Sequence, residues 1–466
     1  MPTPPSTRRH GAALTVAMLG FFIITLDASI VNVALPAVSR DLHTGVTGLQ
    51  WVVDGYVLVF AALLLSAGSL SDRIGARRAY AVGVLVFTAA SLACGLAPNL
   101  ATLVTARLVQ GAGAAMMMPS SLSLLRETYP DLVQRGRALA FWSLGGAVAG
   151  ASGPIVGGAL TLVDWRLIFF INLPAGLATL AVLRRVARSP RRPVPVDVIG
   201  QVAAIAAMGA LTYAVIEAGA AGFTAPKVLA AFTLTLIAVL VFLTAQARAR
   251  HPMVPLDLLR SRPVVIASAT GFAFLGGFSG MVFVYSLYLQ DARGLSSFDT
   301  GLVFVPMAIV SGLTSLIAAR VAERFGPRLP IIGGMAFMGI GLIALAAVPT
   351  DLPAWATMLL MLPVGITGPL AIPASTAVLL QSVPAHRSGI ASGVFNTSRQ
   401  IGTALAVAVF GALLAQRAHL DRGLRESLLI AAAFVLLAAV ANLFTVLPDH
   451  HLEPSAAAAA CAEATA

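Results

Sequence analysis

The sequence predicts an all-α polytopic membrane protein with fourteen transmembrane helices. Of its 466 residues, 58% are hydrophobic and only 11% are charged, whereas a soluble domain carries about 25% charged residues. The apolar residues form long blocks, and about 20 such residues are needed for one helix to cross a bilayer. The composition therefore excludes a soluble enzyme, a disordered chain and a nucleic-acid-binding protein, although the formal net charge is +11.

The apolar blocks follow one another with short polar joints between them. The basic segment 1–11 leads into a first block that is too long for a cleavable signal and lacks an A-x-A site, so we expect it to remain as a span. The alanine-rich segment 448–466 is expected to be a disordered tail. The weakest separation is that between the seventh and eighth blocks, which only the joint 218–226 divides. The fourteen expected spans are 12–35, 50–70, 79–97, 100–120, 137–162, 166–183, 198–218, 227–246, 264–289, 299–319, 329–348, 354–379, 389–415 and 427–447.

The distribution of basic residues predicts the orientation of these spans. If both termini are cytoplasmic, 21 of the 30 Lys and Arg residues lie in cytoplasmic segments, seven lie outside, and two lie within spans. Cytoplasmic joints carry this kind of excess in membrane proteins. We therefore expect a multi-pass protein of a bacterial inner membrane with both termini in the cytoplasm, and we attribute the positive charge to topology and to contact with anionic membrane lipid.

Two patterns recur at nearly the same displacement along the chain. The segment 111–119, GAGAAMMMP, matches 365–373, GITGPLAIP, at a shift of 254 residues. The joint 72–77, DRIGAR, matches 323–328, ERFGPR, at a shift of 251 residues. We therefore predict two parallel six-helix bundles, at 12–183 and 263–447, with the joint and the two extra helices of 184–262 inserted between them.

Few charged residues lie within the expected spans, and each of them is costly in a bilayer. Asp27, Asp54 and Arg107 fall at similar depths in the outer half of the first bundle, counted at about 1.5 Å per residue, so the two carboxylates and the guanidinium are expected to meet there. Burial favours a neutral carboxyl group and a neighbouring guanidinium favours the carboxylate, so these groups can take up and release a proton as a cavity opens. The alternative is a static ion pair that joins the first, second and fourth spans.

Two further charged residues, Glu217 and Arg399, lie in other spans. Glu217 lies at the outer end of the seventh span, from which its side chain can reach water. Arg399 lies in the middle of the thirteenth span with no acidic residue inside the second bundle. It is predicted either to bind substrate or to hydrogen-bond helix carbonyl groups.

The joint between the second and third spans pairs an acid with several arginines. A carboxylate can cap a helix and arginines can clamp a neighbouring segment, so this turn is a candidate gate latch. The alternative is a basic loop that only sets topology. Its candidate residues are Gly68, Asp72, Arg73, Gly75, Arg77 and Arg78.

Small residues gather in the fourth and fifth spans. Gln110 and Gly111 follow Arg107 in a segment whose small residues allow close helix packing. In the fifth span Pro154 removes a backbone hydrogen bond, and glycines beside it permit close approach or bending. The alternative is ordinary helix packing. The fifth-span candidates are Gly153, Pro154, Gly157 and Gly158.

These motifs resemble those of the major facilitator superfamily, over residues 12 to 447. The turn 68–78 is similar to its G-x-L-a-D-r-x-G-r-k signature, and Arg107-x-x-Gln110-Gly111 to its fourth-span motif, which is linked there to proton coupling. The fifth-span motif resembles that of its antiporters. The segment 26–36, LDASIVNVALP, resembles the first span of the fourteen-helix drug:proton antiporters, as do segments 51–56, 165–174 and 396–400. Exporters of the methylenomycin-resistance type look most similar.

The resemblance implies the major facilitator fold and rocker-switch alternating access, with protons entering as a drug or antibiotic leaves. It implies that Asp27 and Asp54 serve protonation or the recognition of an amphiphilic or cationic small molecule. We expect a monomer without cofactor or metal. The alternatives are an exporter of one endogenous metabolite and a proton-coupled uptake symporter, the second of which the antiporter motif disfavours.

Other classes of membrane protein lack support in the sequence. An ATP-driven pump needs G-x-x-x-x-G-K-[ST], and the single lysine, Lys227, lies in no such motif. A membrane redox enzyme needs metal or haem ligands, and all seven histidines lie outside the expected spans. A channel would need neither the repeat nor the latch, and no nucleophile–base pair predicts an enzyme.

Overall fold

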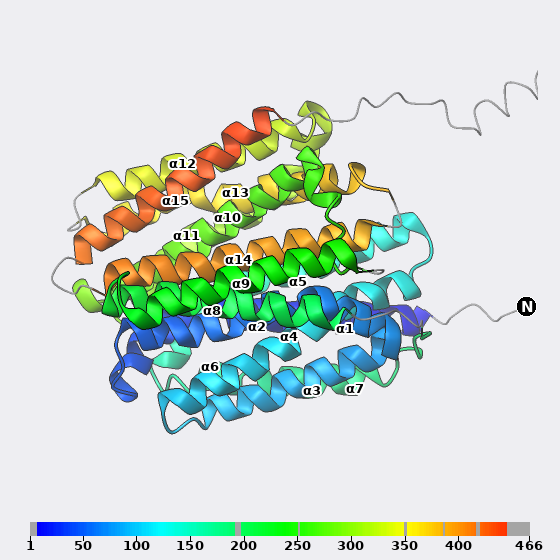
Figure 1. Ribbon diagram of the computed structural model, residues 1–466, viewed down its shortest axis with the longest axis horizontal. Helices are drawn as coiled ribbons and strands as arrows, with labels where there is room; N and C mark the ends of the chain where they lie inside the picture. The colour runs from blue at the N-terminus through cyan, green and yellow to red at the C-terminus, as the bar shows by residue number, and fades with distance from the viewer. Residues whose placement is uncertain are drawn as a thin grey trace, which may run out of the picture.

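The computed structural model describes residues 7–191, 197–249, 252–348, 352–384, 387–415 and 420–444, and these ranges are helical without any strand. The helices run side by side along one direction (Figure 1). Their bounds are α1 (Thr7–Asp41), α2 (Val46–Ile74), α3 (Ala76–Gly95), α4 (Leu100–Thr128), α5 (Leu132–Thr161), α6 (Leu167–Phe170), α7 (Asn172–Leu183), α8 (Val198–Ala221), α9 (Pro226–Arg248), η1 (Leu258–Arg260), α10 (Arg262–Leu287), η2 (Tyr288–Ala292), α11 (Ser297–Phe325), α12 (Arg328–Ala347), α13 (Ala354–Gln381), α14 (Ser388–Leu414) and α15 (Leu420–Leu443).

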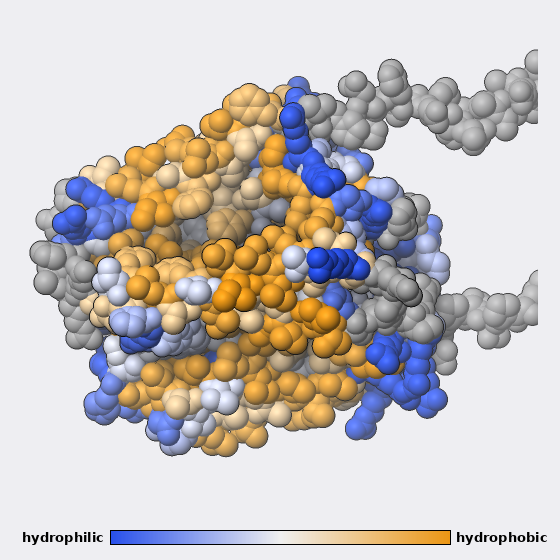
Figure 2. Space-filling model, in the orientation of Figure 1, coloured by the Kyte–Doolittle hydropathy of each residue, from blue (hydrophilic) through white to orange (hydrophobic). Residues whose placement is uncertain are grey.

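The all-α membrane fold is confirmed. Within the described residues, thirteen helices are long and apolar enough to cross a membrane. The predicted sixth span is the shorter apolar stretch Leu167–Leu183, which breaks into α6 and α7 at Ile171. The weakly separated seventh and eighth spans are two distinct helices, α8 and α9. Polar residues gather at the two ends of the helices and apolar ones cover the middle (Figure 2), as a bilayer requires.

Packing divides the helices into two groups with a hairpin beside them. The helices α1–α7 pack among themselves, and so do α10–α15, while the α8–α9 hairpin lies against α2 and α14. In both groups, the repeated turn contains a glycine with a positive φ. Gly75 ends α2 with a φ of 91°, and Gly326 ends α11 with a φ of 73°, a conformation that glycine adopts at little cost. The exact limits of the two predicted bundles remain a prediction.

The bundle has two distinct ends. We call the end that holds the α2–α3 turn the Gly75 end and the opposite end, where α2 begins, the Gln50 end. The first helix starts and the last helix finishes at the Gly75 end (Figure 1). The arginine distribution predicts that this end is cytoplasmic.

The two groups of helices are joined at the Gln50 end. Gln50 of α2 donates through Nε2 to the carbonyl oxygens of Val407 and Ala408 of α14, at 3.2 and 2.6 Å. Gln290 of η2 donates to the carbonyl oxygen of Val33 in α1 at 2.9 Å. These hydrogen bonds join the first helix group to the second. The structure is therefore a conformation that is closed at the Gln50 end.

The predicted orientation can be tested by cysteine labelling. In a background in which alanine replaces Cys94 and Cys461, we expect a cysteine at exposed Ala187, at the Gly75 end, to react with a membrane-impermeant maleimide only after permeabilisation. The matched control is Thr224→Cys in the exposed α8–α9 joint, which should react in intact cells. Labelling at Ala187 in intact cells would reverse the topology.

Candidate functional site

A buried ion pair lies at the centre of the first helix group. Asp27 of α1 is 0% exposed and Arg107 of α4 is 1% exposed, and Arg107 Nη1 lies 2.5 Å from Asp27 Oδ2. The other carboxylate oxygen, Oδ1, accepts hydrogen bonds from Gln110 Nε2 and Asn172 Nδ2, both at 2.9 Å. The predicted meeting of Asp27 and Arg107 is thus present, and three donors satisfy the carboxylate.

A second set of contacts holds these donors in place. Ser91 Oγ of α3 accepts from Gln110 at 3.2 Å and from Asn172 at 3.0 Å. Arg107 Nε donates to the carbonyl oxygen of Val52 at 3.0 Å, and the Arg107 guanidinium lies 4.3 Å from the ring centroid of Tyr56. The pair is therefore fixed by α1, α2, α3, α4 and α7.

Sequence reasoning missed two members of this network as site residues. Asn172 stands directly after the break at Ile171, which turns its amide into the bundle. Its position in the N-x-P segment was a usable signal, because α7 begins there. Ser91 lies in an apolar helix with no signal of its own.

Asp54 is buried without any partner. It is 0% exposed, and neither of its carboxyl oxygens has a hydrogen-bond partner among the described residues. It follows Gln50 by four residues, which places both side chains on the face of α2 that meets α14. Arg107 pairs with Asp27, and neither oxygen of Asp54 has a partner among the described residues, so the three predicted charges do not form one cluster.

Glu217 is at the Gln50 end, as its position in the span predicts. It forms an ion pair with Lys227 of α9, which closes the α8–α9 hairpin. Glu217 is 17% exposed and Lys227 is 52% exposed. This pair lies in the α8–α9 hairpin at the periphery of the bundle, and it is not part of the Asp27 network.

In the described residues, the α2–α3 turn contacts the end of α7 and the segment that follows it. Arg77 donates three bonds, from its backbone N–H to Ser189 Oγ at 3.0 Å and from its guanidinium to the carbonyl oxygens of Leu183 and Arg184, both at 3.2 Å. Asp72 is exposed and makes no ion pair with a described residue. The exposed residues of this turn also include Arg73 and Arg78. A Cβ added at Gly68 would lie 4.0 Å from Pro119 Cβ, which is ordinary van der Waals contact.

The glycines of the fourth and fifth helices mark close backbone contacts. Gly111 faces the backbone of Tyr56 without room for a Cβ. A Cβ on Gly157 would lie 2.8 Å from the carbonyl oxygen of Ile30, and one on Gly158 would lie 2.6 Å from that of Ser297 in the other helix group. Small residues therefore form the seam at which α1, α5 and α11 meet.

Gly153 and Pro154 complete this seam. Gly153 faces Ser29 of α1, and the carbonyl oxygen of Pro154 faces Gly301 of α11. The proline lies inside α5. The predicted fifth-helix motif is thus at the interface between the two helix groups, close to the Gln50 end.

Arg399 lies in α14 beside α10. A Cβ on Gly271 would lie 2.8 Å from Arg399 Cγ, and Arg399 Nη1 donates to Asn396 Oδ1 at 3.3 Å. Its Nε is buried and without a partner among the described residues. Of the two predicted roles, hydrogen bonding to helix carbonyl groups has no contact to support it in the described ranges.

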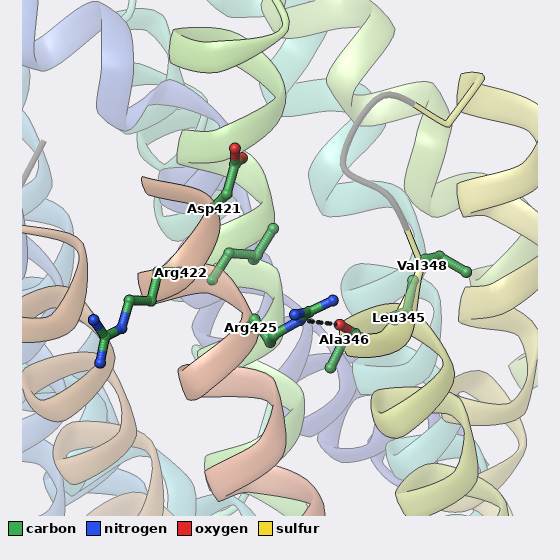
Figure 3. A pocket seen from close by; sticks show the side chains of 7 residues that line it. Leu345, Ala346, Val348, Asp421, Arg422 and Arg425 are labelled. Carbon is green, nitrogen blue, oxygen red and sulfur yellow. Dashed lines mark hydrogen bonds between the residues drawn. The ribbon is translucent and has the colours of Figure 1, made fainter. Parts of the chain in front are cut away.

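A surface hollow at the Gln50 end is separate from all these residues. It has a volume of about 310 Å³ and lies between the end of α12 and the start of α15. Arg425 points across it to the carbonyl oxygen of Ala346, at 2.8 Å, while Arg422 points away (Figure 3). Within the described ranges, no three His, Cys, Asp or Glu side chains lie close enough to hold a metal ion.

The family model described as Major Facilitator Superfamily matches residues 17–407. The chain is 36% identical to "Methylenomycin A resistance protein" of Bacillus subtilis (strain 168), over 93% of this chain and 94% of that protein. It is also 36% identical to "Multidrug resistance protein Stp" of Mycobacterium tuberculosis, over 88% and 78%. A crystal structure of a D-xylose-proton symporter shares the fold, with a TM-score of 0.70 at 16% identity, covering 95% of this chain and 98% of that one.

The Asp27–Arg107 pair predicts a specific pattern of stability. Asp27→Asn or Arg107→Gln leaves one charge buried without its partner, which typically costs about 3–5 kcal/mol. The double variant removes both charges and should recover most of that loss. Thermal unfolding of the purified proteins in detergent measures this, with the exposed pair variant Arg422→Gln as control. Additive losses in the double variant would show that the pair is not coupled.

Proposed function

Because this chain belongs to the Major Facilitator Superfamily, we propose that it is an efflux transporter that exchanges a drug or antibiotic for protons across a bacterial inner membrane. Relatives that match nearly the whole chain carry the names of antibiotic resistance and multidrug resistance proteins. The superfamily consists of transporters, so we propose no catalysed reaction. The two alternatives, export of one endogenous metabolite and proton-coupled uptake, differ from this proposal in substrate and direction.

The observation that carries the coupling mechanism is the contrast between Asp27 and Asp54. Asp27 is held as a carboxylate by Arg107 and two amide donors. Asp54 is equally buried but has no donor among the described residues. An ionised carboxylate without a partner in an apolar interior costs several kcal/mol, so Asp54 is accommodated in this conformation as the neutral acid.

This contrast gives each acid a different role. Asp54 takes a proton when the Gln50 end opens to the outside, because α14 then leaves the face of α2 that holds it. Closure of that end requires the neutral acid, and the proton is released when substrate binds from the Gly75 end. Asp27 is the fixed centre of its half and positions α2 through Arg107 and Val52. A proton cycle on Asp27 itself is the competing hypothesis.

The direction of the cycle follows from the predicted topology. With the Gly75 end in the cytoplasm, the closed Gln50 end makes this an inward-facing conformation. In this conformation Asp72 is exposed and has no ion pair in the described ranges, as expected of a latch that engages only when the Gly75 end closes. The seam at Gly157 and Gly158 then opens on the other side of the membrane.

The proton role of Asp54 has a direct test. Asp54→Asn keeps the shape of the side chain but cannot carry a proton, so substrate-induced proton release in proteoliposomes should fall at least about tenfold, while Asp54→Glu should retain part of it. The substrate is a compound whose export by the unaltered protein has first been established in a susceptibility panel. Glu217→Gln, at the periphery, serves as the matched control and should behave normally. Full proton release by Asp54→Asn together with its loss in Asp27→Asn would transfer the proton to Asp27.

The latch role of Asp72 is tested by separating transport from abundance. Asp72→Asn should reach the membrane in normal amounts but lower export severalfold, because the closed Gly75 end loses an ion pair or a helix cap worth about 1 kcal/mol. Export is compared at equal membrane abundance, with Glu323→Gln in the repeated turn as the matched variant and a smaller effect expected there. Equal export by Asp72→Asn and the unaltered protein would reduce the turn to a topology signal.

A further inference from the structure

We infer that Arg399 and Asn396 form a binding subsite for the anionic group of the exported molecule, and that the exported molecules are organic acids such as carboxylates. The inference rests on the proposed export function and names its substrate class. It departs from the amphiphilic or cationic substrate that the family resemblance implies. Four features of α14 carry it.

The first feature is a polar stripe along one face of α14. Its members are spaced by four, three and four residues, which keeps them on one side of a helix with 3.6 residues per turn. They are Ser392, Asn396, Arg399 and Thr403. Thr403 Oγ1 donates to Ser279 Oγ of α10 at 3.5 Å, so this face borders α10.

The second feature is the direction of this face. Residues 393 and 411 of α14 contact Leu65 and Gln50 of α2, and Ala412 contacts Gly219 of α8. At about 100° per residue, the polar face lies about 90° from the α2 contact and on the side away from α8. It therefore points between the two helix groups rather than toward the α8–α9 hairpin and lipid.

The third feature is an uncompensated positive charge. Arg399 Nε is buried and has no hydrogen-bond partner among the described residues. Within the same residues, the one hydrogen bond of its side chain is the 3.3 Å bond to Asn396 Oδ1. The described acidic residues of α10–α15 lie near helix ends. These are Asp291, Asp299, Glu323, Asp421 and Glu426.

The fourth feature is that Asp54 does not supply the missing charge. Gln50 opposite residues 407–408 and Leu65 opposite residue 393 set the antiparallel register of α2 and α14. This register puts Asp54 about level with residue 404, on the α2-facing side of α14, while Arg399 lies on another side and about 7 Å further along the helix.

These features select the chemistry of the ligand. A carboxylate can accept two parallel hydrogen bonds from a guanidinium, which is the strongest arrangement available to this side chain. Asn396 Nδ2 donates to the carbonyl oxygen of Ser392 at 2.9 Å. This bond fixes the Asn396 amide, whose Oδ1 accepts the hydrogen bond from Arg399. The Arg399 side chain is only partly buried overall, which leaves access for a ligand. A cationic or neutral ligand would leave the buried charge unpaired.

Binding to the purified full-length protein tests the inference separately from export. The probes are nalidixic acid, a fluorescent heteroaromatic carboxylate, and its uncharged carboxamide, measured by fluorescence anisotropy at a pH at which the acid is ionised. We expect the unaltered protein to bind the carboxylate about tenfold more tightly than the carboxamide. Arg399→Gln should abolish this preference without weakening the carboxamide, and Arg399→Lys should keep part of it because the charge remains without the planar fork.

Controls separate the subsite from general damage. Arg422→Gln removes an exposed arginine at the Gln50 end and should leave the preference intact. If Arg399→Gln fails to fold, Asn396→Ala should reduce the preference severalfold by releasing the guanidinium. An unaltered protein that binds both probes equally or neither, or an Arg399→Gln protein that keeps the preference, overturns the subsite.

Export of the same two probes from cells is measured in parallel. Preferential binding of the carboxylate without export of any compound supports the subsite and overturns the proposed efflux function. Export of neutral or cationic compounds without preferential carboxylate binding has the opposite meaning: the efflux function stands and the anion subsite is overturned.

Discussion

One buried negative charge determines how the first half of the protein is built. A carboxylate at 0% exposure must have its charge and its lone pairs satisfied from within. Asp27 obtains this from Arg107 and Gln110 of α4 and from Asn172 of α7. The break between α6 and α7 contributes to this network, because it brings the Asn172 amide to the Asp27 carboxylate. With these helices tied to one point, the first half is suited to move as a unit.

The second half is assembled without such a charge. The shift of the repeat carries Asp27 onto Phe278, so the network has no counterpart there. Packing in that half depends on small residues, as where a Cβ on Gly276 would lie 2.8 Å from the carbonyl oxygen of Gly402. Nothing in the described helices neutralises Arg399. The two halves therefore share a framework but differ in electrostatics. In the first half Asp27 is paired internally with Arg107, whereas in the second half we propose that the charge of Arg399 is paired by a ligand.

The sequence predicts well how deep a residue lies in the membrane, but it predicts poorly in which direction a side chain points from its helix. Apolar block lengths predicted the spans, the repeat predicted the matching turns at Gly75 and Gly326, and counting residues along two helices predicted that Asp27 and Arg107 meet. The same counting grouped Asp54 with them, although its side chain turns toward α14. Helices that are apolar on all sides carry little amphipathic signal to fix their rotation. The role of Ser91 depends on that rotation, and hence no pattern in the sequence revealed it.

The closed end is held by contacts that can part at modest cost. Gln50 and Gln290 donate to carbonyl groups of the opposite half, and a hydrogen bond of this kind contributes about 1 kcal/mol net. Between them, Gly157 and Gly158 supply backbone packing without directional bonds. Two states separated by a few kcal/mol can be interchanged by a ligand or proton that prefers one of them by a similar amount. Burial of an ionised Asp54 in the same interface would also cost several kcal/mol. In the proposed mechanism, protonation of this one carboxyl group is therefore sufficient to decide whether the Gln50 end can close.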